Sequence, residues 1–158
     1  MNPETTPGTP RSSCAPSRGR DGQGPALGGL RPPRSIDVPG IGHKAPIPLG
    51  ARVGPLLCSS AISGKDPATG GLAPTPAGQV DQAFANLRAV LAAGGATLGD
   101  IARLTVTLAD DSLRDEVNRH WLDCFADPAD RPARHIGVQP LGHGMAVQLE
   151  FIAWVAPR

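Results

Sequence analysis

The chain has 158 residues, enough for one domain with a buried core and some additional sequence. Its 15 basic and 14 acidic side chains give a net charge of +1, and the basic residues are scattered, which argues against a dedicated nucleic-acid-binding protein. Cys14, Cys58 and Cys124 have spacings that suit neither a zinc site nor a disulfide framework. We therefore expect a cytoplasmic protein in which Cys58 and Cys124, which have apolar neighbours in the sequence, are small buried side chains.

The first 34 residues differ in composition from the rest of the chain. They are rich in Pro, Gly, Ser and Arg and almost lack large apolar side chains. Such a segment cannot bury enough surface to offset the entropy lost on ordering, so residues 1–34 are predicted to be a disordered extension. They contain no apolar run for a secretory signal or membrane anchor, and their prolines disfavour the amphipathic helix of a transit peptide. The folded domain is expected to span residues 35–158.

The first half of this domain predicts a strand and a long helix. The mostly apolar run from Leu56 to Ile62 follows Gly54-Pro55 and is typical of a buried strand. A turn-forming sequence, Asp-Pro-Ala-Thr-Gly-Gly at 66–71, separates it from the helix. The helix is expected to end at Gly94-Gly95. Its apolar face recurs at helical spacing and consists of Val80, Ala83, Phe84, Leu87, Val90 and Leu91.

A strand and a second helix follow. Apolar residues alternate with threonines from Leu104 to Leu108, which predicts a strand with one buried face. Ser112 with Asp115 resembles a capping box and would begin a helix that Asp127-Pro128 stops. The apolar face of this helix is Leu113, Val117, Trp121, Cys124 and Phe125.

A short β pair is expected to close the domain. Its strands are Arg134–Val138 and Ala146–Val155, joined by a loop that contains proline and glycine. The resulting order, β-β-α-β-α-β-β with two amphipathic helices, predicts an α+β sandwich with both helices on one face of the sheet.

The residues around these last strands indicate a small-molecule site. Arg134 stands where a strand begins, just after a loop closed by Pro132. A guanidinium at the rigid start of a strand is held in place and always charged. Its N–H groups form a planar fork that can donate two parallel hydrogen bonds to a carboxylate. Gln148 and Glu150 occupy alternate positions of the last strand, where a polar pair could hold a water over the bound ligand.

Several short motifs also occur in a characteristic order and spacing over about residues 46–155. They are Cys58-Ser59-Ser60-Ala61, Asp66-Pro67-Ala68-Thr69-Gly70, Gln82 with Asn86-Leu87, Ala93-Gly94-Gly95, Val117-Asn118, Pro132-Ala133-Arg134 and Leu149–Ala153. Together these motifs resemble the RidA family of YjgF-like proteins, which also carries the label endoribonuclease L-PSP.

The resemblance implies a chorismate-mutase-like α+β fold, a two-layer sandwich of one mixed sheet with two helices on one face. It implies assembly as a homotrimer, with active sites in the clefts between subunits. Active members hydrolyse reactive imines and enamines, such as 2-aminoacrylate or aminomuconate, to keto acids and ammonia, without a cofactor. The implied protein is therefore an imine/enamine deaminase, a hydrolase acting on C=N bonds of a small 2-imino or enamino acid.

The resemblance also implies site residues. Arg134 matches the family arginine that clamps the substrate carboxylate, and Ser60 and Ala61 match the strand end beside the substrate. Two further positions depart from the family pattern. Ile47 stands where a pocket tyrosine is usual, and Ile136 stands where a cysteine is common.

Gln148 occupies the position of the family glutamate that positions the hydrolytic water. The loop before this strand is one residue shorter than the usual pattern. If the strand were shifted by one residue relative to the family pattern, Val147 and Leu149 would point into the site, which their apolar character forbids. A shift by two residues would instead bring Glu150 into the site. Gln148 and Glu150 both stay candidates for the catalytic position. An amide can orient water but cannot accept its proton, whereas a carboxylate can do both.

The histidines add one candidate. His43 lies near the position of the missing tyrosine and could supply a polar group there, although a loop histidine is more often solvated. His135 follows Arg134 and should point to the opposite face of the strand, and His120 borders the apolar stripe of its helix. The four histidines are scattered and do not indicate a metal site.

Three functions remain open. The first is a cofactor-free imine deaminase, and the second is a trimeric module that binds a small carboxylate without turning it over. The third is an RNA-acting translation inhibitor, which the near-neutral charge and the lack of tyrosine disfavour, because few side chains could stack on bases.

Overall fold

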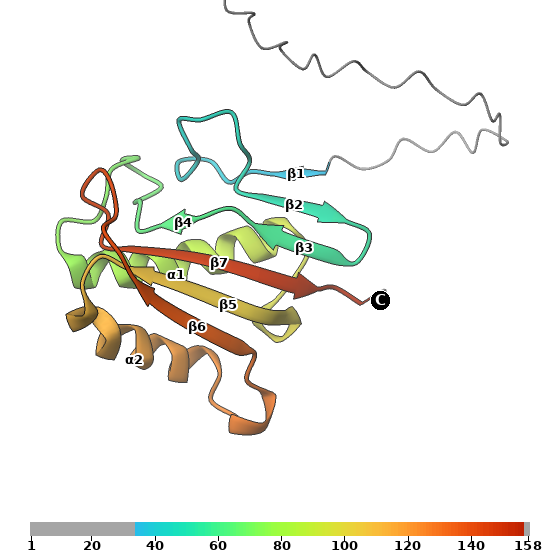
Figure 1. Ribbon diagram of the computed structural model, residues 1–158. Coiled ribbons are helices and arrows are strands. Elements are labelled where there is room, and N and C mark those ends of the chain that lie inside the picture. The colour runs from blue at the N-terminus through green and yellow to red at the C-terminus, as the bar shows by residue number, and fades with distance from the viewer. Residues whose placement is uncertain (1–33, 157–158) are drawn as a thin grey trace, which may run out of the picture. The chain divides into compact units, whose positions relative to one another are not determined.

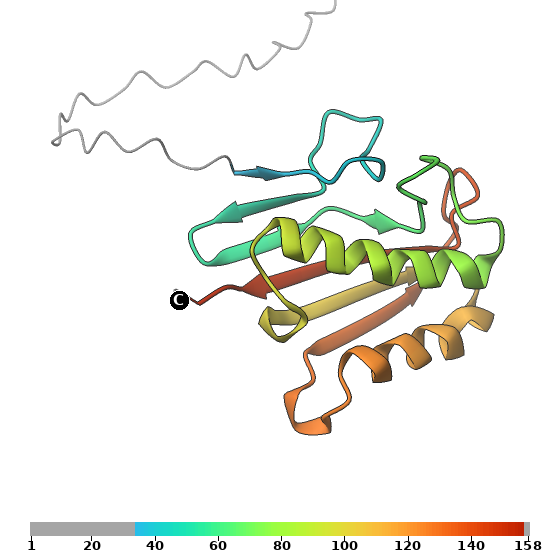
Figure 2. The ribbon, with the colours of Figure 1, turned by 180° about the vertical axis from the view of Figure 1, so that it is seen from behind.

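The computed structural model describes residues 34–156, which form one mixed sheet covered by two helices (Figure 1). Helices α1 (Pro76–Ala93) and α2 (Arg114–Cys124) lie on the same face of the sheet, as the view from behind shows (Figure 2). The predicted α+β sandwich with two layers is confirmed. The predicted extension, residues 1–34, lies outside the described residues except for Arg34. Within residues 34–156 no helix is long and apolar enough to cross a membrane.

The sheet has seven strands in the order β1-β2-β3-β7-β5-β6, with β4 pairing β7 beyond the end of β3. All neighbouring pairs are antiparallel except β5 and β6, which are parallel and are connected through α2, because parallel strands need a crossover. The strands are β1 (Ser35–Ile36), β2 (Gly50–Val53), β3 (Leu56–Ser59), β4 (Ile62–Ser63), β5 (Ile101–Leu108), β6 (Ala133–Val138) and β7 (Val147–Trp154).

Four expectations about strands are wrong. The run from Leu56 to Ile62 is two strands, β3 and β4, because the chain leaves the β pattern at Ser60-Ala61. Leu56 is 40% exposed rather than buried, since its side chain lies on the uncovered face of the sheet opposite Trp154. The last two strands are not a pair, because β5 lies between β6 and β7. The expected order has two strands before the first helix, whereas the structure has four, β1 to β4.

Helix α1 begins and ends where its sequence indicates. The Thr75 side chain accepts a hydrogen bond from the Gly78 amide at 3.0 Å, and Pro76 takes the first helical position. At the other end Gly95 adopts φ 72°, a left-handed conformation that favours glycine. The amide of Ala96 then bonds the carbonyl of Leu91 at 2.8 Å, which closes a Schellman motif.

Helix α2 is capped differently from the prediction. The carboxylate of Asp110 accepts a hydrogen bond of 2.8 Å from the Ser112 amide and caps a short 3-10 turn, Asp111–Leu113, that leads into the helix. The predicted capping box of Ser112 and Asp115 is therefore wrong, because the chain is already helical at Ser112. The helix ends at Cys124, before Asp127-Pro128.

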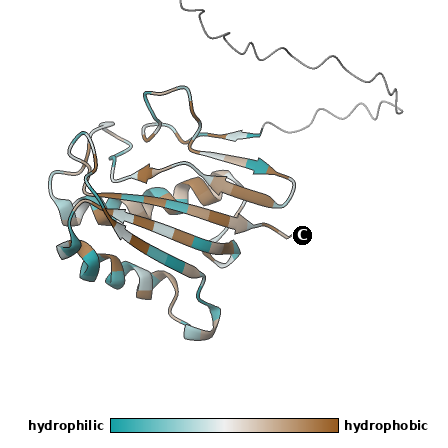
Figure 3. Cartoon of the chain, viewed as in Figure 1, coloured by the Kyte–Doolittle hydropathy of each residue, from teal (hydrophilic) through white to brown (hydrophobic). Residues whose placement is uncertain are grey.

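The core lies between the helices and the covered face of the sheet. On the sheet side of the core, alternate residues of β7 are almost fully buried: Val147, Leu149, Phe151 and Ala153. Both helices contribute the apolar faces predicted for them, among them Phe84 of α1 and Val117 of α2. Hydrophobic residues accordingly alternate with more hydrophilic ones along β5 (Figure 3). The other face of the sheet carries no helix within the described part of the chain, and we call it the open face.

Candidate functional site

Arg134 lies near the start of β6, on the face of the sheet that the helices cover. It stands opposite Leu104 in the parallel register, and Leu104 is fully buried in the core. The Nη2 atom of Arg134 donates a hydrogen bond of 2.9 Å to Oδ1 of Asn118, and its guanidinium carbon lies 4.6 Å from the ring centre of Trp121. Asn118 and Trp121 both belong to α2, so the helix fixes the direction and the plane of the guanidinium.

The charge of Arg134 has no acidic counterpart nearby. Among residues 34–156, no carboxylate forms an ion pair with its guanidinium. Burial lowers the pKa of Arg134, and the like charges of Arg114 and Arg131 lower it further. Both effects disfavour the cation, so an anion bound beside Arg134 would relieve them.

Gln148 and Glu150 lie on the open face, one above the other along β7. Gln148 stands opposite Thr107 and Ser63, and its amide nitrogen lies 3.5 Å from the sulfur of Met145. Glu150 is exposed and stands opposite Thr105. Because the two side chains share a face, the structure keeps both as candidates for positioning a water.

The predicted site residues therefore fall on two sides of the sheet. Arg134 projects toward the helices, whereas Gln148 and Glu150 project away from them. Val147 and Leu149 alternate with Gln148 and Glu150 along β7 and are fully buried on the covered face, so a one-residue shift of this strand would turn apolar core residues toward the open face. One chain alone does not bring the arginine and the polar pair together.

Ser60 and Ala61 form the break between β3 and β4, next to the loop that carries Ile47. The Ser60 hydroxyl donates to the carbonyl of Pro48 at 2.8 Å, and its amide donates to the carbonyl of Leu49 at 2.9 Å. These bonds hold Ser60 beside Ile47, whose side chain is 51% exposed. The structure thus brings Ser60 and Ala61 next to the loop that carries Ile47, at the break between β3 and β4 beside the middle of β7.

The remaining candidates differ in their surroundings. Ile136 projects on the same side of β6 as Arg134 and packs partly against the core. His135 is exposed and stands opposite Thr105 on the open face, as expected from its position after Arg134. His43 is half-buried rather than solvated, and its Nε2 atom is buried without a hydrogen-bond partner among the described residues.

Sequence reasoning missed a polar cluster that joins the two helices. His120 of α2 stacks on Phe84 of α1 with ring centres 4.8 Å apart, and its Nε2 atom lies 2.6 Å from Oδ1 of Asp81. This contact and a hydrogen bond from Arg119 lower the pKa of Asp81. The spacing of Glu116 and His120, four residues apart on one helix, was the available signal, but it does not identify Asp81.

The same cluster has the ligand types of a metal site. Asp81, Glu116 and His120 each offer one atom within 4.8 Å of the others. A guanidinium nitrogen of Arg119, however, already contacts all three: it hydrogen-bonds Glu116, lies 2.8 Å from Asp81 and lies 3.0 Å from His120. The cation of this cluster is therefore an arginine, and the arrangement links the helices.

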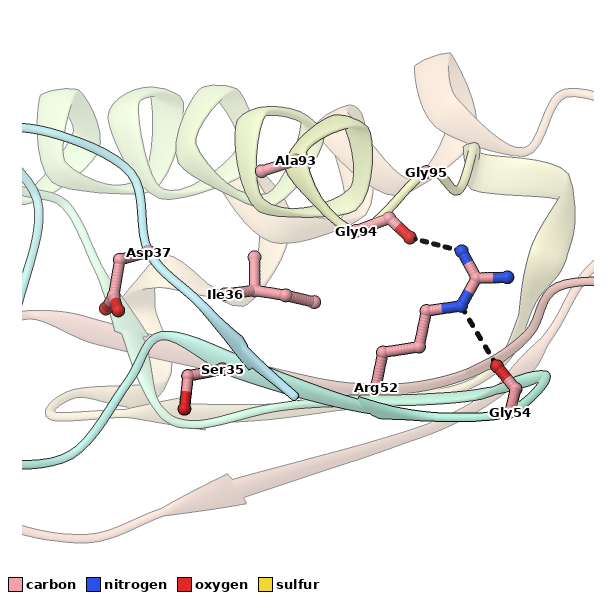
Figure 4. A pocket seen from close by; sticks show the side chains of 8 residues that line it. All are labelled: Ser35, Ile36, Asp37, Arg52, Gly54, Ala93, Gly94 and Gly95. Atoms are coloured by element: carbon pink, nitrogen blue, oxygen red, sulfur yellow. Dashed lines mark hydrogen bonds between the residues drawn. The ribbon is translucent and has the colours of Figure 1, made fainter. Parts of the chain in front are cut away.

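A hollow of about 650 Å³ lies between β1, β2 and the C-terminal end of α1 (Figure 4). Arg52 reaches across it and donates to the carbonyls of Gly94 at 2.8 Å and Gly54 at 3.0 Å. A cation at the C-terminal end of a helix satisfies its last carbonyls and its dipole. None of the predicted site residues lines this hollow, which we interpret as the place where Arg52 caps α1.

Comparisons with known proteins agree with the resemblance found in the sequence. The profile of the family described as Endoribonuclease L-PSP matches residues 48–155. A RutC family protein of Aquifex aeolicus is 33% identical over 126 residues, which cover 76% of this chain and 98% of that protein.

Solved structures give the same result. RidA from an Antarctic Psychrobacter is 26% identical, with a TM-score of 0.72 over 78% of this chain and 100% of the other. The YjgF gene product of E. coli is 25% identical, with a TM-score of 0.68 over 77% of this chain and 98% of the other. The protein therefore belongs to the endoribonuclease L-PSP family, which includes the RidA and YjgF proteins.

Proposed function

We propose that this protein is a cofactor-independent deaminase that hydrolyses small 2-imino or enamino acids to keto acids and ammonia. The observation that carries the proposal is Arg134, a charged fork held by Asn118 and Trp121 without an acidic partner among the described residues. Such a group binds a carboxylate through two parallel hydrogen bonds. The free thiols of Cys58 and Cys124 support the cytoplasm as the place where the protein works.

We further propose that the active site forms between subunits of a homotrimer. Arg134 and the polar pair of Gln148 and Glu150 lie on opposite sides of one sheet, so a complete site needs the arginine of one subunit and the polar pair of another. The open face also exposes apolar side chains that a second subunit would cover. Four of them lie on the neighbouring strands β2, β3 and β7: Val53, Leu56, Ile152 and Trp154.

The proposed reaction relies on positioning and on electrostatics. Arg134 holds the substrate carboxylate and so orients the imine carbon toward a water on Gln148 or Glu150. The water oxygen bonds to that carbon, and its proton passes to the nitrogen. Collapse of the resulting carbinolamine breaks the C–N bond and releases ammonia and the keto acid. Glu150 could accept the proton of the water, whereas Gln148 could only orient it.

Substitution of Arg134 tests the proposal. Arg134→Ala should abolish hydrolysis of 2-aminoacrylate above the uncatalysed rate, and Arg134→Lys should restore little, because an ammonium cannot reproduce the bidentate fork. Arg88 is a suitable control, since it is an exposed arginine on α1 that contacts Cys124, and Arg88→Ala should leave the rate unchanged. Parental activity in Arg134→Ala would overturn the assignment.

Two variants on the open face separate an enzyme from a binding module. If Gln148 orients the water, Gln148→Glu should raise the rate, because a carboxylate can also take the proton. If Glu150 performs that role, Glu150→Gln should be the damaging change and Gln148→Glu should be neutral. A binding module predicts no hydrolysis above the uncatalysed rate in the parent or in either variant, with ligand binding lost only on changing Arg134.

A further inference from the structure

Three arginines follow one side of α2, and Arg134 is the middle one. Arg114 lies at the first residue of the helix, four residues before Asn118. Arg134 contacts the middle of the helix through Asn118 and Trp121. Arg131 contacts the far end, where its Nε donates to the carbonyl of Phe125 at 2.9 Å. We call Arg114, Arg134 and Arg131 the arginine row.

The contacts along α2 give the spacing of this row. The second bond of Arg131 goes from Nη2 to the carbonyl of Ala126 at 3.3 Å, so its guanidinium lies at the level of residues 125–126. Arg134 lies at the level of residues 118–121. Because α2 ends at Cys124, Arg131 binds just beyond the helix end, and at a rise of about 1.5 Å per residue the two guanidinium groups lie roughly 5–10 Å apart along the helix axis. That separation suits the two ends of a short, extended dicarboxylate.

The row carries more positive charge than its acidic neighbours offset. Arg114 forms an ion pair with Asp111 at 2.6 Å. Arg131 and Arg134 have no ion pair among the described residues, and their hydrogen bonds go to neutral oxygens. The like charges of Arg114 and Arg131 are close enough to lower the pKa of Arg134. Two of the three charges are therefore uncompensated, whereas a ligand with one carboxylate would offset only one.

We propose that the substrate carries a second carboxylate, which Arg131 binds while Arg134 binds the first. This inference rests on the proposed function, because it takes Arg134 as the clamp for the reacting end of the substrate. Arg131 then determines specificity and takes no part in the reaction. Its bonds to the carbonyls of Phe125 and Ala126 hold its guanidinium in place at the end of α2. Nη1, which forms no hydrogen bond within the described part of the chain, is left to meet the ligand.

Binding of two unreactive probes tests the proposal without any activity measurement. Glutarate carries two carboxylates and butyrate carries one, and calorimetry at low salt gives the affinity of each. Glutarate should bind the parent protein at least about tenfold more tightly than butyrate, the usual effect of one additional charged hydrogen-bonded pair. Arg131→Gln should remove this preference and leave butyrate binding within about twofold of the parent. Arg88→Gln, the matched control, should change neither affinity.

The outcomes separate this inference from the proposed function. Equal affinities for glutarate and butyrate in the parent protein overturn the inference and leave the proposed function standing. Loss of both ligands in Arg134→Ala is expected, whereas unchanged binding there overturns the proposed function as well. If Arg131→Gln does not fold, Arg131→Lys, which keeps the charge, should retain a preference for glutarate. Displacement of glutarate by a single-stranded RNA oligonucleotide would assign the row to phosphates instead, and the dicarboxylate proposal would be wrong.

Discussion

Ile152→Glu should dissociate the proposed trimer without unfolding its subunits. Ile152 is 43% exposed and lies on the open face between Cys58 and Arg103. In a single chain the substitution changes only an exposed position, so the free energy of unfolding should move by no more than about 0.5 kcal/mol. In the trimer the same side chain would be covered by a neighbour.

The size of the effect follows from the exposed fraction of Ile152. An exposure of 43% leaves roughly 75 Å² of apolar surface to be covered, worth about 2 kcal/mol per subunit at about 25 cal/mol per Å². An unpaired carboxylate buried there adds several kcal/mol more. Each trimer contains the substitution three times, so assembly at micromolar concentration should be lost.

Light scattering and circular dichroism measure the two parts of this prediction. The parent protein should have the mass of a trimer, and Ile152→Glu should have the mass of one folded chain. Leu122→Glu provides the control, because Leu122 is 52% exposed on α2 rather than on the open face, and this variant should stay trimeric. A trimeric Ile152→Glu protein, or a monomeric parent, would refute the assembly through the open face.

Three further predictions concern the rest of the chain. Gly64→Ala should destabilise the fold by about 1–3 kcal/mol in chemical denaturation, because the new methyl group would overlap the backbone of Gln79, whereas Gly42→Ala, which meets nothing within 4 Å, should be close to neutral. The lowered pKa of Asp81 adds stability above its unfolded pKa, and this stability is lost as the pH falls through the lowered pKa of the folded state, so Asp81→Asn should lower the melting temperature slightly at pH 7 and by less at pH 3. Deleting residues 1–33, which carry few large apolar side chains, should leave the melting temperature unchanged.

The apolar repeats of the sequence correctly located the helices and strands whose residues are neighbours in the chain. The 3.6-residue apolar repeat and the glycines at 94–95 located α1 and its end, and the alternation from Leu104 to Leu108 located most of β5. The break between β3 and β4 was not predictable in this way. It depends on Ser60, whose hydrogen bond to Pro48 spans 12 residues of sequence and stands outside any strand pattern.

The sequence allows the candidate residues to be named but does not show how they are arranged. The motif around Arg134 and the alternate polar residues of β7 are visible in the sequence. The face to which each points depends on the strand beside it, and β5 separates β6 from β7. The contact of Asp81 with His120 joins residues 39 apart on two helices, so no local pattern shows it.

A subunit-mixing experiment tests the central claim, that Arg134 and the polar pair of the open face complete one site from two subunits. Arg134→Ala and the double variant Gln148→Ala/Glu150→Ala should each be inactive trimers. Co-expressed with different tags and purified as mixed trimers, they should recover about a third of the parental activity. That fraction follows because, in a trimer that contains both variants, one of the three sites pairs an intact arginine with an intact polar pair. Mixed trimers that hydrolyse 2-aminoacrylate no faster than either inactive parent variant would contradict the shared site.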